Sequence, residues 1–255
     1  MPTALITGGT VGIGHAFATA LAAKGYDLVL ASRDKAGLDA VAAGFRDRYG
    51  IGVEVIRTDL AVRDDVLALA ARLEDPDRPI DLLVNNAGFA VHDSLLVEDF
   101  SPHERAMEVM ALDVLILSGA AARSMKARGH GAILNVTSSS AVITTGNYSA
   151  IKAWATVYTE GLANELRGTG VKVMAVMPGW VKTEFHSRGG VKAHNLPDIV
   201  WIDADDLVRQ ALRDLERGKV LSVPTKKWAF MVGVGRIAPR RAIRWVSRAL
   251  TKSRE

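Results

Sequence analysis

The sequence predicts an α/β protein: a single domain built on a doubly wound parallel sheet, followed by a basic helical tail. Short apolar runs rich in β-branched residues alternate with longer segments of helical composition, which is the pattern of βαβ units around a buried sheet. A glycine cluster follows the first of these runs directly. The length of 255 residues, 49% of them hydrophobic, is enough for one large domain with a buried core.

The expected strands and helices follow one another in order along the chain. Strands are expected at 4–6, 28–31, 53–57, 80–84, 132–136, 171–176 and 220–223. Helices are expected at 15–24, 35–49, 62–74, 102–128, 149–167 and 204–217. Asp203 is placed to cap the last helix, and Gly168 and Gly218 follow helix ends, where a left-handed residue is favoured. Right-handed crossovers between parallel strands then place ligands at the carboxyl ends of the strands.

Charge divides the chain near residue 224. Residues 226–255 carry nine basic residues and one acidic residue, whereas residues 1–225 carry 23 basic and 27 acidic residues. We therefore expect a mildly acidic domain over 1–224 and a strongly basic tail over 225–255.

Composition also limits the class of protein. The chain has no cysteine, which excludes disulfides and thiolate metal sites, and we expect no bound metal. No apolar run approaches the roughly 18 residues of a membrane span. The first expected strand begins within three residues of the N-terminus, which leaves no room for a secretory signal, so we expect a cytoplasmic protein.

The glycine cluster at residues 7–14 predicts a nucleotide-binding loop. Without Cβ atoms, the backbone N–H groups of such a loop can approach a pyrophosphate, and the N-terminus of the following helix adds partial positive charge. The spacing is G-x-x-x-G-x-G rather than the usual G-x-G-x-x-G, and a plain turn is the alternative. The residues expected to bind are Gly8, Thr10, Gly12, Ile13 and Gly14.

The end of the second strand predicts which dinucleotide is bound. An acidic residue there would accept both ribose hydroxyls and repel a 2'-phosphate, whereas an arginine pairs with that phosphate. This chain has Ser32 and Arg33, with Asp34 one place later, so we expect NADP rather than NAD. The alternative is that Arg33 is a solvated loop charge.

Further residues that could contact the dinucleotide follow the third and fourth strands. Asp59 and Leu60 follow the third, and Asp59 could accept a hydrogen bond from an adenine amino group. Asn85, Ala87 and Gly88 follow the fourth, where small residues leave space for the cofactor. Alone, these residues could also be ordinary turn residues.

Tyr148 and Lys152 are four residues apart, so they share one face of the expected helix. Attraction to the ammonium would lower the tyrosine pKa from about 10 toward neutrality, which suits a general acid or base. Upstream, a strand ends in a hydroxyl cluster at Ser138 that could hold a substrate oxygen. The alternative is that Tyr148 and Lys152 form only a surface pair.

The order and spacing of these motifs resemble the short-chain dehydrogenases/reductases over residues 1–222. The matching motifs are Thr7 to Gly14, Asn85 to Gly88, Asn135 to Ser138, Tyr148 with Lys152, and Pro178-Gly179 with Thr183. The resemblance implies a Rossmann-type fold and a hydride transfer between nicotinamide and a carbonyl or secondary alcohol. It also implies that Tyr148 exchanges the proton, that Lys152 lowers its pKa and binds the nicotinamide ribose, and that Ser138 orients the substrate oxygen.

The resemblance further places the nicotinamide and the substrate. It implies that Pro178, Gly179, Val181 and Thr183 border the nicotinamide and that residues 184–200 form a substrate lid. Trp180, Phe185 and Trp201 give this region an apolar edge, which indicates an apolar substrate. With the basic tail, this composition leads us to expect a lipid-like substrate.

Two departures from the family pattern bear on catalysis. Asp113 takes the place where the family usually has an asparagine that completes a water relay behind the lysine. Ser138 and Tyr148 are ten residues apart, fewer than is usual, so Ser139 or Ser140 could take the serine role. Both departures would favour the alternative to an enzyme, a regulatory protein that binds the cofactor without turnover.

The tail contains an amphipathic basic helix, with Ile243, Val246 and Leu250 at helical spacing and arginines between them. Residues 226–255 could lie on an anionic membrane at the inner surface, with Trp245 near the headgroups. Equally, the helix could pack on the core or at a subunit interface. We expect no nucleic acid partner, because the body is acidic, and we expect a homo-oligomer paired through 102–128 and 149–167.

Overall fold

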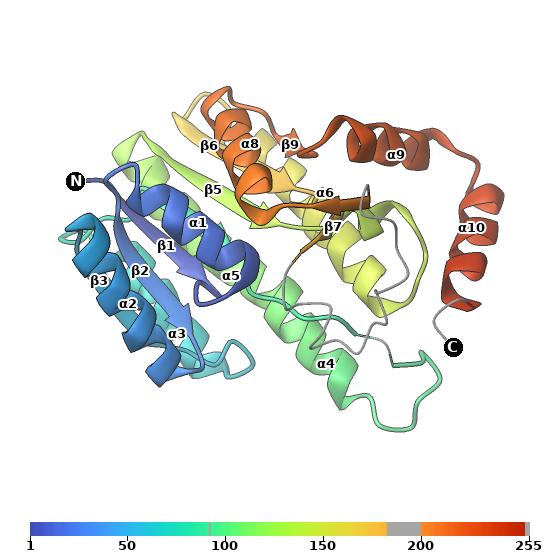
Figure 1. Cartoon of the computed structure of the whole chain (residues 1–255), viewed down its shortest axis with the longest axis horizontal. Helices are drawn as coiled ribbons and strands as arrows, with labels where there is room; N and C mark the ends of the chain where they lie inside the picture. Colours follow the sequence, from blue (N-terminus) through green and yellow to red (C-terminus); the bar gives the residue numbers. More distant parts are fainter. Residues whose placement is uncertain (92, 183–199, 253–255) are drawn as a thin grey trace.

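A seven-stranded parallel sheet forms the centre of the protein, whose computed structural model describes residues 1–91, 93–182 and 200–252 (Figure 1). The strand order is β3-β2-β1-β4-β5-β6-β9. This sheet confirms the predicted doubly wound α/β class. The strands are β1 (Thr3–Thr7), β2 (Asp27–Ser32), β3 (Val53–Arg57), β4 (Leu82–Asn85), β5 (Gly131–Val136), β6 (Val171–Val176) and β9 (Leu221–Ser222).

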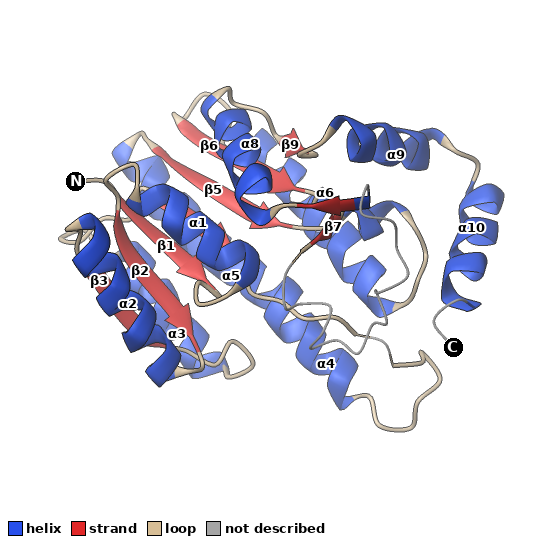
Figure 2. Cartoon of the chain, viewed as in Figure 1, coloured by secondary structure: helices blue, strands red, loops and turns tan. Residues whose placement is uncertain are grey.

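Helices cover both faces of the sheet (Figure 2). One face packs against α1 (Gly12–Ala22), α2 (Lys35–Tyr49) and α8 (Ala204–Glu216). The other packs against α3 (Arg63–Glu74), α5 (Asp113–Arg128) and α6 (Asn147–Glu165). The sheet is therefore buried on both sides, as its apolar strands predict.

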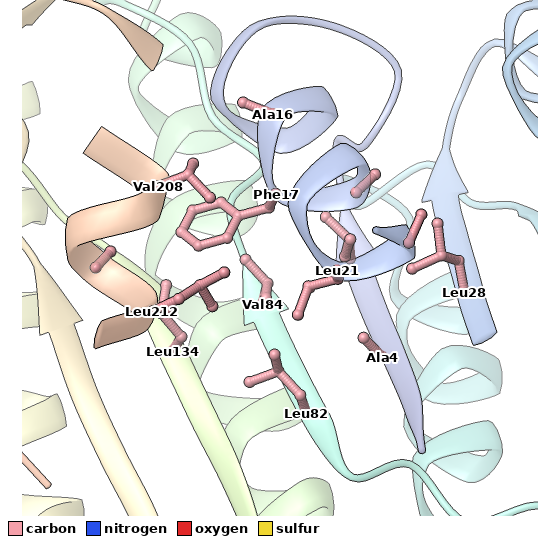
Figure 3. Close-up of a cluster of buried hydrophobic side chains, with 14 of the residues drawn as sticks. Ala4, Ala16, Phe17, Leu21, Leu28, Leu82, Val84, Leu134, Val208 and Leu212 are labelled. Atoms are coloured by element: carbon pink, nitrogen blue, oxygen red, sulfur yellow. The ribbon is translucent and has the colours of Figure 1, made fainter. Parts of the chain in front are cut away.

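Alternate residues of each strand enter opposite cores. In β1, Ala4 and Ile6 join the core beneath α1 and α8, where Phe17 of α1 is fully buried (Figure 3). Leu5, between them, joins the core beneath α3 and α5. Burying each large apolar side chain fully contributes about 1.5–3 kcal/mol to the stability of the fold. The central strands are thus held from both faces, which fixes the position of their carboxyl ends.

Side-chain caps begin α2 and α8. Asp34 accepts a hydrogen bond from Gly37 N (3.0 Å) at the start of α2. Asp203 accepts from the backbone N–H groups of Asp205 and Asp206 at the start of α8, as expected. Gly218 follows that helix with φ +73°, in the left-handed region that favours glycine.

The helix expected over 102–128 is interrupted. It consists of α4 (Ser101–Met107), a π-helical turn over Glu108–Leu112, and α5. A π turn inserts one residue and shifts the faces of the two flanking helices relative to each other. The apolar periodicity of the segment does not reveal this shift, and the shift changes which of its residues face the site.

The chain beyond β6 forms smaller elements. The strands β7 (Trp180–Val181) and β8 (Trp201–Ile202) pair in parallel, and α9 (Lys226–Ile237) and α10 (Arg240–Lys252) follow β9 at one end of the molecule (Figure 1). Of the expected lid, only Val200 lies within the described residues, and Thr183 and Phe185 lie outside them. Among the described helices, none has the length and apolar character needed to cross a membrane.

Candidate active site

Parallel pairing brings the predicted motifs to one edge of the sheet. The strands β1, β4 and β5 are neighbours, so the loops that follow their carboxyl ends lie together (Figure 2). These loops hold the glycine cluster, Asn85 to Gly88, and Ser138. The first turns of α6 add Tyr148 and Lys152. The carboxyl edge of such a sheet is where ligands bind in doubly wound folds.

The glycine loop has the geometry of an anion cradle. Gly8 and Gly12 have φ of +68° and +58°, and α1 begins at Gly12. A Cβ on Gly14 would lie 2.1 Å from the Gly8 carbonyl oxygen, so no side chain fits there. The close approach of these backbones, with a helix N-terminus beside them, fits the pyrophosphate of a dinucleotide. Thr10 and Ile13, also predicted to bind, lie in the same turn.

Thr7 and Asn86 fix the shape of this loop, and both were missing from the predicted site residues. The Asn86 side-chain amide donates to Thr7 O (3.0 Å) and Gly8 O (3.1 Å). In return, Thr7 Oγ1 accepts from the backbone N–H groups of Asn86 (3.0 Å) and Ala87 (3.1 Å). The signal available in the sequence was the polar residue at the end of each of two strands that turn out to be neighbours.

Asn85 lies beneath the site. Its side-chain amide is buried and donates to Ser118 Oγ (3.0 Å) and Asn135 Oδ1 (2.9 Å). Asn135 in turn donates to Thr159 Oγ1 (2.9 Å). This network joins β4 and β5 to α5 and α6, so the Asn85 side chain braces the site from within the core, while Ala87 and Gly88 stand at its surface.

The end of β2 carries the residues predicted to select the cofactor. Arg33 is exposed and forms no ion pair within the described part of the chain. The neighbouring carboxylate, Asp34, is occupied as the cap of α2. Ser32 is half-buried beside them. The end of this strand therefore presents a cation and a hydroxyl, which suits a phosphate better than a ribose diol.

Asp59 follows β3 and is already engaged by protein groups. Burial opposes its ionisation, but hydrogen bonds from Ala61 N (3.0 Å) and from Arg105 of α4 hold its pKa below the usual range, with Arg33 adding to the effect. Asp59 is thus an ionised acceptor at neutral pH. Leu60 is buried in the core beneath α3, so its backbone rather than its side chain is available to a ligand.

Ser138, Tyr148 and Lys152 form a connected group. The side chain of Ser138 is hydrogen-bonded to Tyr148, and its Oγ accepts from Ser140 N (3.0 Å). Lys152 Nζ donates to Val136 O (2.9 Å) and lies 5.7 Å from the centre of the Tyr148 ring. Among the three consecutive serines, the geometry brings Ser138 to the tyrosine.

The Tyr148 pKa differs from the expected direction. Burial raises it to about 12, and the hydrogen bond from Ser138 works against that rise. Burial also lowers the Lys152 pKa to about 8. The ammonium is bonded to a backbone carbonyl and faces the ring of Tyr148, so its attraction does not offset the loss of solvation. The expected lowering of the tyrosine pKa is therefore wrong.

Met110, in the π-helical turn, lies beside Gly88, as does the lysine. A Cβ on Gly88 would lie 3.0 Å from Met110 Sδ and 3.7 Å from Lys152 Nζ, so these two side chains converge there. The charged groups that act on the Asp113 carboxyl are Glu108, Arg63 and Asp59. The π turn shifts the faces of α4 and α5 relative to each other.

The buried Asp113 carboxyl has its own electrostatic environment. Burial raises its pKa to about 8, and the nearby Glu108 carboxylate adds to the rise. Its Oδ2 atom has no hydrogen-bond partner among the described residues. Asp113 is therefore a protonated carboxyl beside the site at neutral pH, and no contact described for it reaches Lys152.

The order of motifs and this geometry agree with comparisons to known proteins. A family of sequences described as short chain dehydrogenase matches residues 2–190. The chain belongs to the short-chain dehydrogenase family. It is accordingly an NAD(P)-dependent oxidoreductase of the class that acts on CH–OH groups, which confirms the predicted resemblance.

Three known proteins illustrate the range of proteins to which this short-chain dehydrogenase is similar. The very-long-chain 3-oxoacyl-CoA reductase of Anas platyrhynchos is 34% identical over 194 residues, which cover 71% of this chain and 60% of the relative. The structure of a short-chain dehydrogenase from Sphingobium yanoikuyae in complex with NADPH has TM-score 0.85 and 34% identity, covering 92% of this chain and 94% of that one. The bulky-bulky ketone specific alcohol dehydrogenase from Comamonas testosteroni has TM-score 0.80 and 28% identity, covering 92% of both chains.

In this short-chain dehydrogenase, the short segment between Ser138 and Tyr148 is a single 3-10 turn, Ser139–Val142, followed by an extended stretch. Ser139 N donates to Pro178 O (2.8 Å), which ties the turn to the Pro178-Gly179 motif. Val142 and Thr144 of this segment each contact one of the C-terminal helices. A Cβ on Gly235 of α9 would lie 2.6 Å from Val142 Cγ2, and Thr144 N donates to Ser247 Oγ of α10 (2.9 Å).

The remaining predicted nicotinamide-side residues lie at the end of β6. Gly179 packs beneath the indole of Trp228 from α9, so closely that a Cβ on Gly179 would lie 2.0 Å from the ring. Pro178 and Val181 are buried beside it. The C-terminal helices thus contact the rest of the protein at Gly179, Val142 and Thr144, around the site. The composition of the tail does not reveal these contacts.

Proposed function

We propose that this protein is an NADP(H)-dependent oxidoreductase that reduces a carbonyl or oxidises a secondary alcohol, with Tyr148 as the general acid and base. The observation that carries the proposal is the connected group of Ser138, Tyr148 and Lys152 at the carboxyl edge of the sheet. The bound nicotinamide supplies or accepts the hydride. The protein must supply or accept the proton, and we assign this role to Tyr148.

The residues that hold the cofactor follow from the fit of the site. We assign the pyrophosphate to the loop from Gly8 to Gly14 and the N-terminus of α1. We assign the adenine side to Asp59 and Leu60. On the nicotinamide side we place Ala87, Gly88, Pro178, Gly179, Val181 and Thr183, the last of which lies outside the described residues.

In reduction, the Tyr148 hydroxyl donates its proton to the substrate oxygen. Its raised pKa keeps it protonated at neutral pH, which is the form that reduction requires. Ser138, already bonded to Tyr148, positions the same oxygen by a second hydrogen bond. In oxidation the tyrosine must first lose its proton, and the Lys152 ammonium one helical turn away favours that anion.

The preference for NADP over NAD rests on Arg33. Its exposed guanidinium is free of ion pairs to the described residues, while the adjacent Asp34 is committed to the cap of α2. Arginine binds phosphate through two parallel hydrogen bonds, so we assign the 2'-phosphate to Arg33 with Ser32 beside it. The NADPH in the Sphingobium yanoikuyae relative supports this assignment.

The substrate that the site favours is apolar, and we propose a lipid-like ketone or alcohol. Trp180 and Trp201 lie edge to face, with ring centres 5.8 Å apart, where β7 and β8 lead toward the expected lid. Aromatic surface of this kind favours apolar groups. The relatives named for a bulky ketone and for a very-long-chain acyl substrate support the same direction.

We also propose a homo-oligomer formed through α5 and α6. Their outer faces leave apolar side chains exposed, namely Leu112 before α5, Leu115, Trp154 and Val157. Two such helices on each subunit could pair around a two-fold axis. A mass of 27.3 kDa in solution, the mass of one chain, would contradict this proposal.

Tyr148→Phe tests the mechanism. We expect kcat for NADPH-dependent reduction of bulky ketones to fall by about 10²- to 10⁴-fold, because the proton donor is lost. Affinity for NADPH should stay unchanged. Tyr158→Phe is the matched control on the same helix, because its hydroxyl bonds to Leu115 O and lies away from Ser138.

The outcomes separate the alternatives. Full activity in Tyr148→Phe would refute the proposed acid and base. If the unmodified protein binds NADPH but reduces none of a broad panel of carbonyls, the regulatory alternative replaces the enzyme.

A further inference from the structure

The C-terminal helices α9 and α10 leave an extended basic and apolar surface exposed. We call it the tail surface. Its apolar members are Phe230, Met231, Val234, Ile237, Trp245 and Val246, and its basic members are Lys226, Arg240, Arg241, Arg244 and Arg248. The helices lie at the end of the molecule beyond β9 (Figure 1). In α10 the arginines are interleaved with Trp245 and Val246, whereas α9 begins with Lys226 and continues with exposed apolar residues. A partner lying along both helices would therefore meet both kinds of residue.

Both helices are attached to the body by a few residues. Trp228 and Val232 of α9 and Ile243 and Ser247 of α10 are buried. Ser247 accepts from Thr144 N, and Arg236 pairs with Glu160 of α6 at 2.8 Å. The face of α10 that packs on the core, one of the two expected alternatives, is thus the face of Ile243 and Ser247. The opposite face, with Trp245, remains in solvent.

The exposure of the large apolar side chains needs a partner to explain it. Phe230 and Trp245 are each 73% exposed and Ile237 is 83% exposed. Burial of such side chains is favourable, so three of them on the tail surface are costly to leave in water. Such a surface is characteristic of an interaction site.

The charge of the tail indicates the chemistry of that partner. Residues 226–255 hold nine basic residues and one acidic residue, and Arg240, Arg241, Arg244 and Arg248 form no ion pairs within the described ranges. Cations interleaved with exposed aromatic and aliphatic side chains match a partner whose outer layer is anionic and whose interior is apolar. An anionic phospholipid bilayer has this structure.

We propose that the tail surface binds an anionic phospholipid bilayer, with α9 and α10 lying in its interface. Trp245, Phe230 and Ile237 enter the acyl boundary, and the arginines of α10 lie against the headgroups. The attraction of each basic residue to such a surface decays within about a Debye length and weakens as salt is added. The binding is therefore reversible and sensitive to salt.

This contact would also orient the active site. The same helices contact Val142 and Thr144, in the segment between Ser138 and Tyr148. The bilayer would thus lie beside the segment that leads to the catalytic tyrosine. This consequence rests on the proposed function, because it matters only if the substrate is lipid-like. Bilayer binding itself does not depend on catalysis.

The test is flotation of the full-length protein with vesicles. We expect it to float with phosphatidylcholine vesicles that contain about 30% phosphatidylglycerol, to stay behind with pure phosphatidylcholine, and to be released at about 0.5 M salt. The double variant Arg241→Glu/Arg244→Glu should bind at least about tenfold more weakly. Trp245→Ser should weaken binding without changing net charge.

The controls keep the result interpretable. Arg167→Glu and Leu67→Ser change an exposed cation and an exposed apolar residue elsewhere, and we expect vesicle binding to be unchanged. All variants alter exposed residues, and circular dichroism checks that each is folded. Ketone reduction in solution is measured in parallel, so a failure of vesicle binding is distinguished from a failure of the proposed enzyme.

Two results would overturn the proposal. One is that the unmodified protein does not float with anionic vesicles, whatever its activity. The other is that the glutamate variant floats as well as the unmodified protein. Binding of a duplex oligonucleotide in place of vesicles would assign the tail surface to nucleic acid instead.

Discussion

The two ends of the chain meet the same site in different ways. The N-terminal loop, Gly8 to Gly14, is tightly enclosed: a Cβ on Gly14 has no space, and Asn86 bonds to the loop at two carbonyls. The C-terminal helices touch the site through a few side chains, such as Trp228 and Ser247, and expose most of their remaining surface.

This difference shows which of the two regions restricts residue type more strongly. In the loop, backbone atoms must come close to a ligand, so residue type is restricted at fixed spacing. In the tail, helical pattern and charge suffice for the exposed surface, and its contacts depend on the shape of the body beneath. We therefore expect single substitutions in the loop to have larger effects than those in the tail.

Gly14→Ala should have the largest effect. The new Cβ would meet Gly8 O at 2.1 Å, so the loop and the start of α1 must move apart. We expect NADPH affinity to fall by at least about 100-fold, measured by fluorescence titration.

Gly44→Ala in α2 is the matched control. A Cβ there meets no atom within 4 Å, so the change should stabilise the helix by about 0.5–1 kcal/mol and leave cofactor binding intact. Unchanged NADPH affinity in Gly14→Ala would break the comparison, because it would show that the loop tolerates a side chain.

Arg33→Ala should have an intermediate effect that depends on the cofactor. Loss of the phosphate partner should weaken NADPH binding by about 10- to 100-fold and change NADH binding little. Calorimetric titration with both cofactors measures the ratio. Arg167→Ala, at an exposed position of the same type, serves as control. Equal losses for both cofactors would show that Arg33 does not recognise the 2'-phosphate.

Ser247→Ala should have the smallest effect of the three. It removes the acceptor of the Thr144 N–H and should lower the free energy of unfolding by about 0.5–1.5 kcal/mol, measured in urea. NADPH affinity should not change. The exposed neighbour Arg248→Ala is the control. A loss of cofactor affinity as large as that expected for Gly14→Ala would remove the distinction between the two ends.

Much of the fold could be predicted from the sequence. The bounds expected for α2, β3 and β6 agree with the structure, because a cap, a left-handed glycine or a buried apolar run marks each one locally. What failed depended on distant residues. The π turn that holds Met110 beside Gly88 has no local signature.

The site shows the same division. The positions of Ser138, Tyr148 and Lys152 were evident from their motifs, whereas their pKa directions required knowledge of burial. The choice between Asn85 and Asn86 is set by strand pairing: the first points to Ser118 in the core and the second to the glycine loop. The contact of Ser247 with Thr144 joins residues 103 apart, which no pattern in either segment indicates.

The cap of α2 has a consequence for any attempt to change the cofactor. Asp34 is the acidic residue nearest the position that would recognise an unphosphorylated ribose, yet its carboxylate is held by Gly37 N, and a Cβ on Gly37 would lie 2.5 Å from it. Redirecting Asp34 toward a sugar would leave the helix end uncapped, at a cost of about 1 kcal/mol. A change of cofactor preference at the end of β2 should therefore be reached more easily through residues 32 and 33 than through Asp34.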